Sequence, residues 1–486
     1  MGTDPKVAAA VGSITPEDVI RRIGVMAHDS MRGRNTPSPE LNEVAAWIGS
    51  EFQRMGLQPG GDNGSFLQRY TVERIRIDQT QSGVHIADGP TWRVGTELLR
   101  HFGGPAPNGV SGSAVLITGS EDLSSLANAN LKNAIALVAV SSLNAAQGIV
   151  GPVMEQGPAA VLLVTDSDIR PDGRWNQLLN EQARANLVPS WTSGGIPLLE
   201  IRANTLAPVL EGHNVDLAAI KRESTDRVTA QPVPDLQVTV TLTPEVLESI
   251  QAPNTVGILE GSDPVLKNEF IVFSAHMDHV GVGRPVDGDS IHNGADDDAS
   301  GTAGIMELAE AFSMLNPRPK RSLVFVTVSG EEKGLWGSDY FAANSPMPSE
   351  NVVANLNADM IGRNWPDTIV VIGKEHSDLG ETLNRVNTAH PELNMTAIDD
   401  LWPDERFYFR SDHFNFAKRG VPILFFFNGV HDDYHRPSDE VDAIDAEKES
   451  RIVKLMFYLG LEVANADERP KWDLESYKRI VEMGRN

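Results

Sequence analysis

The chain has 486 residues, of which 41% are hydrophobic and 22% are charged, proportions typical of a soluble globular enzyme. This length exceeds what one hydrophobic core usually serves, so we expect two domains. The formal net charge of −26 argues against general nucleic-acid or anionic-membrane binding, because both need basic surfaces.

The sequence contains no cysteine, which excludes disulfide frameworks, thiolate zinc sites and cysteine nucleophiles. Any bound metal must therefore use histidine and carboxylate ligands. No apolar run approaches the roughly 18–20 residues that a membrane span requires. The first residues hold no apolar signal core, which fits either a cytoplasmic protein or a mature form that has lost its signal.

The N-terminal region predicts two helices and a strand. Residues 15–29 and 38–57 place apolar side chains at helical spacing, and each segment begins with a capping candidate, Thr15 or Ser38. Residues 66–77 alternate between apolar and polar side chains, as a strand does.

Residues 82–233 differ in composition and predict a β-rich accessory domain. Short apolar runs are separated by small and polar residues, and one helical stretch lies at 145–157. No segment here combines histidines with acids. The predicted strands are 112–119, 133–140, 159–166 and 196–201.

From about residue 236 onward, strands alternate with helices, which predicts an α/β fold with a mixed, largely parallel sheet covered by helices. The strand at 66–77 is expected to join this sheet. Residues 1–81 and 234–486 would then form one discontinuous domain, with 82–233 inserted in it. The predicted strands are 236–242, 268–276, 321–329, 351–359, 368–373 and 421–427, and the helices are 300–315, 377–389 and 449–465.

Candidate metal ligands follow several of these strands. Eight of the 12 histidines lie between residues 276 and 435, and ligands of open α/β sheets gather beyond the carboxyl ends of strands. A loop histidine, a solvated acidic pair or acids at a helix N-terminus explain each group singly, but not their joint placement. The candidates are His276, Asp296, Glu332, Asp359 and His435, with Glu331 beside them.

This residue set suits two metal ions. Two histidines and three carboxylates supply three negative charges against the four positive charges of two zinc ions, and a bridging hydroxide would bring the centre to neutrality. Paired ions about 3.5–4 Å apart acidify bound water and stabilise a developing oxyanion. One carboxylate must bridge the ions, and another must stay free to accept the water's proton. The consecutive Glu331 and Glu332 could provide the free base and a ligand. No HExxH motif is present, so that kind of single-zinc site is excluded.

The segments SAHMDHVG, NGADDDASG, VSGEEKGLWGS, NADMIGR, YFRSDHFNF and DYHRPSDE resemble, in order and residue type, the co-catalytic zinc aminopeptidase and glutamate carboxypeptidase family (aminopeptidase Y-like metallopeptidases). The resemblance extends to the N-terminal helices and, more loosely, to a protease-associated domain at 82–233. It implies a zinc-peptidase α/β/α sandwich, two Zn²⁺ ions, peptide substrates and a secreted or periplasmic location.

The resemblance also implies roles for the candidate ligands. His276 and Asp359 would bind one zinc ion. Glu332 and His435 would bind the other, and Asp296 would bridge them.

Other roles follow from the same resemblance. Glu331 would be the general base and later the general acid, and Asp278 would orient a ligand imidazole. A cis peptide bond is expected between Asp296 and Asp297. Three nearby histidines match no ligand position and are interpreted as loop or neighbouring residues: His279, His292 and His431.

Two choices stay open at this stage. Tyr408 is the preferred oxyanion-stabilising tyrosine, with Tyr434 as its rival. Removal of N-terminal residues is the preferred activity, because an acidic site suits a free α-amine. A carboxypeptidase or dipeptidase is the alternative, since Arg363 or Arg410 could bind a terminal carboxylate. A glutaminyl cyclase with one zinc ion and a non-catalytic receptor-like domain are remoter alternatives, which the complete ligand set disfavours.

Overall fold

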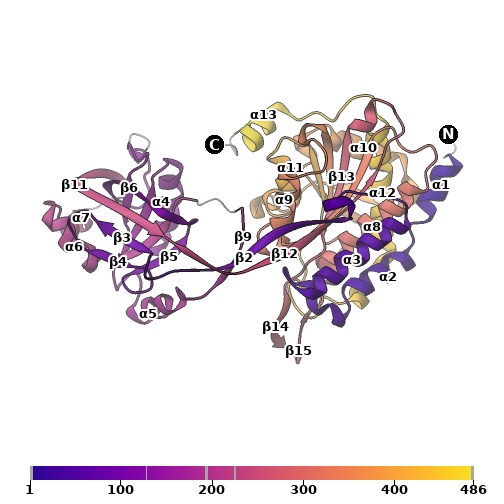
Figure 1. Ribbon diagram of the computed structural model, residues 1–486. Helices are drawn as coiled ribbons and strands as arrows, with labels where there is room; N and C mark the ends of the chain where they lie inside the picture. The colour runs from indigo at the N-terminus through magenta and orange to yellow at the C-terminus, as the bar shows by residue number, and fades with distance from the viewer. Residues whose placement is uncertain (1–3, 127–128, 192–194, 224–225, 483–486) are drawn as a thin grey trace. The chain divides into compact units, whose positions relative to one another are not determined.

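The structure, a computed structural model, describes residues 4–126, 129–191, 195–223 and 226–482 (Figure 1). These residues form two compact units, each with its own sheet and apolar core. The first unit comprises Met1–Thr71 and Gln251–Asn486, and the inserted unit comprises Val72–Ile250.

The chain passes from one unit to the other within two long strands, β2 (Leu67–Ile77) and β12 (Pro244–Leu259). The inserted unit is therefore wider than the predicted insertion at 82–233. Residues 236–242, predicted to begin the return to the first unit, belong instead to β11 (Thr229–Leu242) in the sheet of the inserted unit. Alternating apolar residues predict a strand but not the sheet that it joins.

A mixed sheet forms the centre of the first unit. Besides β2 and β12, its strands are β1 (Gln58–Pro59), β13 (Phe270–His276), β16 (Ser322–Val328), β17 (Val352–Ala358), β18 (Thr368–Ile372), β19 (Thr396–Ile398) and β20 (Ile423–Phe426). They follow the order β19-β18-β20-β17-β13-β16-β12-β2, with β1 on β12. The central strands β16, β13, β17 and β20 are parallel, and β12 and β18 pair antiparallel with their neighbours β16 and β20. The predicted α/β class is confirmed.

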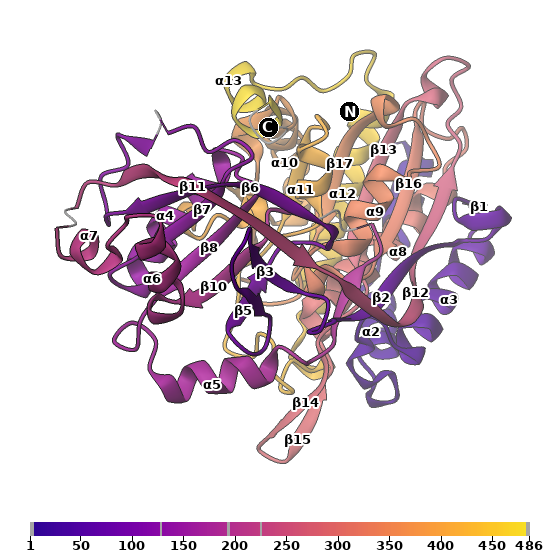
Figure 2. The same ribbon diagram turned by 60° about the vertical axis from the view of Figure 1, so that its left-hand side comes forward.

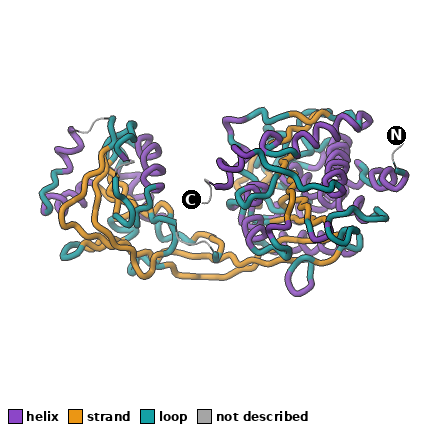
Figure 3. The backbone as a smooth tube through the Cα atoms, turned by 90° about the horizontal axis from the view of Figure 1, so that it is seen from above, coloured by secondary structure: helices purple, strands orange, loops and turns teal. Residues whose placement is uncertain are grey.

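Helices cover both faces of this sheet, which gives three layers (Figure 3). In β13, Phe273 faces one apolar layer and Val272 faces the other, as alternation requires. The first layer contains α1 (Pro5–Gly12), α2 (Pro16–Met26), α3 (Pro39–Arg54), α8 (Gly301–Ser313), α10 (Leu379–Ala389) and α12 (Ala446–Asn465). The second contains α9 (Trp336–Ala343) and α11 (His413–Ala417), and α13 (Leu474–Tyr477) lies near the C-terminus.

The N-terminal helices begin where the sequence predicts. The Thr15 hydroxyl accepts a hydrogen bond from the Asp18 amide at the start of α2, and the Ser38 hydroxyl accepts one from the Leu41 amide at the start of α3. A hairpin of β14 (Gly281–Val286) and β15 (Asp289–His292) completes the first unit. Within the described ranges, no helix combines the length and apolar character that crossing a membrane would need.

The inserted unit contains an eight-stranded sheet with helices (Figure 2). Its strand order is β4 (Thr91–Arg93), β3 (Gly83–Ile86), β11, β6 (Ala106–Thr118), β7 (Ile135–Ala139), β8 (Ala160–Thr165), β10 (Leu198–Arg202) and β5 (Leu98–Phe102). The strands β6, β7, β8 and β10 are parallel, and α4 (Leu143–Glu155) packs on one face, with α6 (Ala203–Gly212) and α7 (Leu217–Glu223) on the other. The remaining elements are α5 (Asp172–Glu181) and β9 (Asn186–Pro189), which pairs with β2.

A fully buried carboxylate, Glu200 in β10, is satisfied by three neighbours. Arg170 donates two hydrogen bonds to it, at 2.7 and 2.9 Å, and the Thr165 hydroxyl donates one at 2.6 Å. The Nε2 atom of His101 lies 2.7 Å away. Burial alone would raise the pKa of Glu200, but these hydrogen bonds outweigh burial and lower the pKa to about 2.

We expect Glu200→Gln to lower the free energy of unfolding of the inserted unit by about 3–5 kcal/mol near pH 7, because Arg170 would lose its buried counter-charge. The folded pKa is depressed, so the stabilisation is complete above the ordinary value of 4.5 and is lost as the pH falls toward about 2. Urea unfolding followed by circular dichroism at several pH values measures both effects. Asp172→Asn, which removes the exposed partner of Arg202, is the control, with an expected loss below about 1 kcal/mol. Equal losses in the two variants would contradict the prediction.

Candidate metal centre

Three neighbouring strands deliver metal-binding side chains to one edge of the first-unit sheet. β13 ends at His276, and β17 is followed directly by Asp359. β16 leads into the turn that holds Glu331 and Glu332. Because β13 pairs in parallel with both β16 and β17, the carboxyl ends of all three strands meet at this edge.

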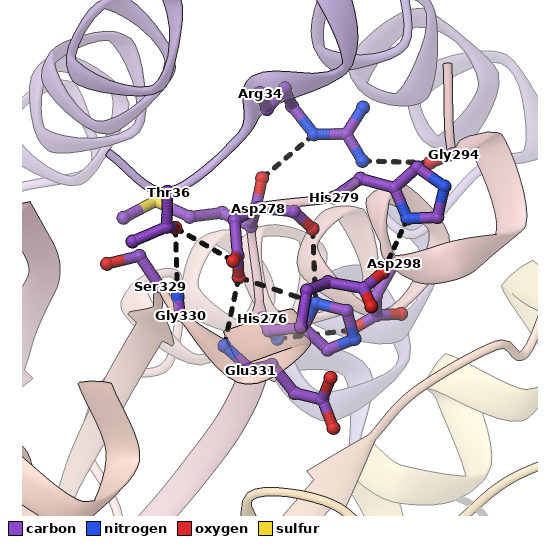
Figure 4. Close-up of polar contacts among 12 residues, drawn as sticks. Arg34, Thr36, His276, Asp278, His279, Gly294, Asp298, Ser329, Gly330 and Glu331 are labelled. Atoms are coloured by element: carbon purple, nitrogen blue, oxygen red, sulfur yellow. Dashed lines mark hydrogen bonds and ion pairs between the residues drawn. The ribbon is translucent and has the colours of Figure 1, made fainter. Parts of the chain in front are cut away.

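One buried arginine, Arg34, holds the loops that flank this edge (Figure 4). Its guanidinium donates hydrogen bonds to four backbone carbonyls, those of Met26, Met277, Asn293 and Gly294. The loop after His276 is thereby tied to the loop before the three consecutive aspartates at 296–298. Nothing in the sequence indicated this role, because an isolated arginine between two predicted helices matches no motif that would mark it as buried or structural.

The carboxylate at the middle of the cluster is that of Asp297, not of Asp296. Its Oδ1 atom lies 3.3 Å from Nε2 of His276, and its Oδ2 atom lies 3.1 Å from Nε2 of His435. Asp359 Oδ1 lies 3.6 Å from the same His276 nitrogen. The two oxygens of Asp297 therefore face different halves of the cluster, as a bridging ligand requires.

Asp296, the predicted bridge, is buried but faces elsewhere. Its Oδ1 atom accepts a hydrogen bond from the Gly362 amide at 2.7 Å, and its Oδ2 atom lies 3.2 Å from Nε2 of His431. The cis peptide bond is also one position later than predicted, between Asp297 and Asp298. The sequence alone could not show which of the three consecutive aspartates faces the cluster, because the backbone turn before α8 determines where each side chain points.

A second group surrounds Oδ2 of Asp297. Glu332 Oε2 lies 3.2 Å from Nε2 of His435, and Glu332 Oε1 lies 2.8 Å from Nδ1 of His279. That His279 nitrogen is 3.6 Å from Asp297 Oδ2. The sequence interpretation left His279 outside the ligand set; its position three residues after His276 was the available signal.

Asp278 connects the first histidine to the turn that carries Glu331 (Figure 4). Its carboxylate accepts hydrogen bonds from the Thr36 hydroxyl at 2.8 Å and from the Glu331 amide at 3.3 Å. The same carboxylate lies 3.7 Å from Nδ1 of His276, and the Asp278 carbonyl is closer, at 3.1 Å. The backbone carbonyl of Asp278, rather than its carboxylate, therefore lies within hydrogen-bond distance of the His276 imidazole, and the carboxylate holds the backbone of Glu331.

The Glu331 carboxyl lines the cavity at the cluster. Burial raises its pKa well above the ordinary value, and neighbouring carboxylates, Asp412 foremost, raise it further against the opposing charge of His276. A raised pKa makes the carboxylate a stronger base.

The structure places Tyr434, rather than the preferred Tyr408, at the cluster. The Tyr434 ring stacks on the His435 imidazole, with centroids 3.9 Å apart, and lines the cavity. Tyr408 is buried away from it, edge-on to His376 and His413 with centroids 4.6 and 5.6 Å away. The family resemblance did not reveal that the Tyr408 ring turns into the core.

The rest of the cavity is mostly apolar. Its apolar lining consists of Met360, Phe407, Phe425, Phe427 and Val430. Of the two arginines considered from the sequence, Arg410 lines the cavity, 4.7 Å above the Phe407 ring, whereas Arg363 is paired with Asp433 at 2.7 Å.

The donor set fits zinc. Nitrogen and oxygen ligands about 2.0–2.1 Å from zinc at tetrahedral angles lie roughly 3.3–3.4 Å apart. The nitrogen-to-oxygen distances around Asp297 and its neighbours are 3.1, 3.2, 3.3 and 3.6 Å. Within the described ranges, the buried atoms Oδ2 of Asp297 and Oε1 of Glu332 have no hydrogen-bond partner. A shared cation would satisfy these oxygens.

Buried imidazoles and carboxylates at the edge of an α/β sheet, beside a carboxyl group outside the donor set, are the kind of residues that metal-dependent hydrolases use. Residues 254–460 match the profile of peptidase family M28.

Individual zinc proteases and aminopeptidases also resemble this chain. A probable zinc metalloprotease of Pyricularia oryzae is 36% identical over 147 residues, which cover 29% of this chain and 28% of that protein. Aminopeptidase YwaD of Bacillus subtilis is 25% identical over 280 residues, or 55% of this chain and 56% of that protein. The chain thus spans between about a quarter and about half of these relatives. The structure of an aminopeptidase from Aneurinibacillus sp. strain AM-1 covers 94% of this chain and 95% of its own, with 20% identity and a TM-score of 0.51, and shows the shared fold.

We expect Asp297→Asn to reduce the zinc content far more than Asp296→Asn does. Asparagine is neutral and a poor bridge, so Asp297→Asn should leave one ion or fewer per chain, compared with the two ions expected for the wild type. Asp296→Asn should keep the wild-type content, because Asp296 faces Gly362 and His431. Mass spectrometry of metals after dialysis measures this. Loss of metal confined to Asp296→Asn would restore the original assignment.

Proposed function

We propose that the protein is a zinc-dependent aminopeptidase that removes N-terminal residues from peptides. The position of Asp297 between two imidazole–carboxylate groups, with Glu331 close by but outside both groups, carries this proposal. Two zinc ions would supply an acidified water nucleophile and stabilise the developing oxyanion. The residues that would bind them are His276, Asp297, Asp359, Glu332 and His435.

Glu331 is the proposed general base and acid. Its carboxylate would accept the proton of the attacking water and later donate it to the leaving amine. The raised pKa strengthens the carboxylate as a base for the first transfer. Asp278 keeps this side chain in place through its hydrogen bond with the Glu331 amide.

Tyr434 is the proposed donor to the oxyanion. Its ring is fixed against His435, and burial together with nearby carboxylates raises the pKa of its hydroxyl. The hydroxyl therefore keeps its proton at working pH and can donate a hydrogen bond to the tetrahedral oxygen. Tyr408, which does not line the cavity, is set aside for this role.

We expect Glu331→Gln to keep both metal ions but lower kcat by about 10²–10⁴-fold, the usual contribution of a general base. Glutamine preserves the shape of the side chain but cannot accept the proton. Steady-state rates together with metal content check the prediction, and Glu475→Gln, at an exposed position of α13, is the control. Near wild-type activity in Glu331→Gln would contradict the assignment.

The carboxylates of the cluster favour a positively charged substrate group, which the free α-amine of a peptide provides. The apolar cavity wall suits a large apolar N-terminal side chain. Arg363 is neutralised by Asp433, so the alternative of a carboxypeptidase or dipeptidase rests on Arg410, which lines the cavity and has Glu405 3.4 Å away.

Blocked substrates separate these activities. We expect the zinc-loaded protein to hydrolyse leucyl-alaninamide and to lose more than about 100-fold in kcat/KM on N-acetyl-leucyl-alanine, because acetylation removes the charge of the amine. A carboxypeptidase would show the reverse order, and a dipeptidase would cleave only unblocked leucyl-alanine. Addition of a chelator, followed by zinc, is the control.

We also propose, from the resemblance, that the inserted unit is a protease-associated-like domain and that the protein acts in a secreted or periplasmic location. The position of the insertion between β2 and β12 supports the first proposal. Fractionation of the cells that make the native protein tests the second.

A further inference from the structure

Within the described ranges, the imidazole of His279 is fully buried without a hydrogen bond to either ring nitrogen. Its Nδ1 atom nevertheless lies 2.8 Å from Oε1 of Glu332 and 3.6 Å from Oδ2 of Asp297. Those two oxygens are the same buried atoms that also lack hydrogen bonds. Three buried atoms that can each bind a metal ion, and that lack hydrogen-bond partners among the described residues, therefore face one another. Burying them unpaired costs free energy unless a cation lies between them.

We propose that His279 is a further ligand of the second zinc ion, through Nδ1, beside Asp297, Glu332 and His435. The inference rests on the proposed function. The distances from Nδ1 to the two oxygens lie on either side of the roughly 3.3 Å expected for ligands of one zinc ion. One ion would then have four protein ligands, whereas the other, held by His276, Asp297 and Asp359, would have three.

The surrounding backbone is shaped to hold this ring. Gly294 has a positive φ of 59°, and a Cβ atom there would lie 2.5 Å from Cγ of His279. A side chain at 294 would therefore displace the imidazole. Arg34 accepts a hydrogen bond from the His279 amide through its carbonyl and donates one to the Gly294 carbonyl (Figure 4). The loop that carries the ring and the loop that makes room for it are thus fixed by the same residue.

A competing role would be orientation of Glu332 by a hydrogen bond from His279. Partners of this kind typically change metal affinity by 10–100-fold. A glutamine at 279 can still donate such a hydrogen bond, but it does not replace an imidazole ligand. The two roles therefore predict different outcomes for His279→Gln.

The test measures Co²⁺ and Zn²⁺ binding by the full-length apoprotein. We expect His279→Ala and His279→Gln alike to bind the second ion more than about 100-fold more weakly and to change the visible spectrum of bound Co²⁺. The control is His292→Gln, because His292 contacts the Gly281 carbonyl instead of the cluster; it should match the wild type. A His279→Gln variant with wild-type affinity and spectrum overturns the proposal.

X-ray absorption of the zinc-loaded wild type gives a readout that does not depend on a variant folding. Three histidines shared by two ions give about 1.5 imidazoles per zinc, and two histidines give about one. A value near one overturns the role of His279 and leaves the two-metal site intact. Fewer than two ions per wild-type chain would instead refute the proposed function itself.

Discussion

The first unit depends on the burial of several carboxylates at one sheet edge. Asp297, Glu332 and Asp359 repel one another there, and each loses hydration on burial. Imidazoles compensate part of this charge: burial alone would lower the pKa of His435, but Asp297 and Glu332 raise it to about 10. Because zinc binds the neutral form of an imidazole, zinc binding at His435 would release a proton.

Around that cluster, the fold acts through a few buried connections to the backbone. Arg34 ties together the loops on either side of the hairpin, and Asp278 joins the turn of Glu331 to the first histidine. Both residues act on backbone groups, so they fix where the loops run as well as where one side chain points. The strand ends place the candidate ligands at one edge of the sheet. The hydrogen bonds of Arg34 and Asp278 then fix the loops that orient those side chains toward one another.

The sequence predicted the α/β class and the longer helices α2, α3, α4, α8, α10 and α12, because apolar periodicity and capping residues are local signals. It predicted about half of the strands and missed others, among them β12, and it missed helices such as α1 and α9. It also predicted which strand ends carry His276 and Asp359. It named Asp296 as the bridge, whereas the carboxylate that lies between His276 and His435 is that of Asp297, since the choice between the two aspartates depends on the path of the turn. It assigned residues 236–242 to the first unit, because the alternation of apolar and polar residues predicts a strand but does not show which strand it pairs with.

The insertion has a further consequence for chain entropy. The chain leaves and re-enters the first unit through β2 and β12, which are neighbours in one sheet. Just inside the insertion, Gly83 lies opposite Thr241 in a second antiparallel pair. An unstructured loop of this length would cost the host fold roughly 4–5 kcal/mol to close. Because the insertion brings its own ends together when it folds, it removes most of that cost, and the host gains a second domain without a long open loop in its sheet.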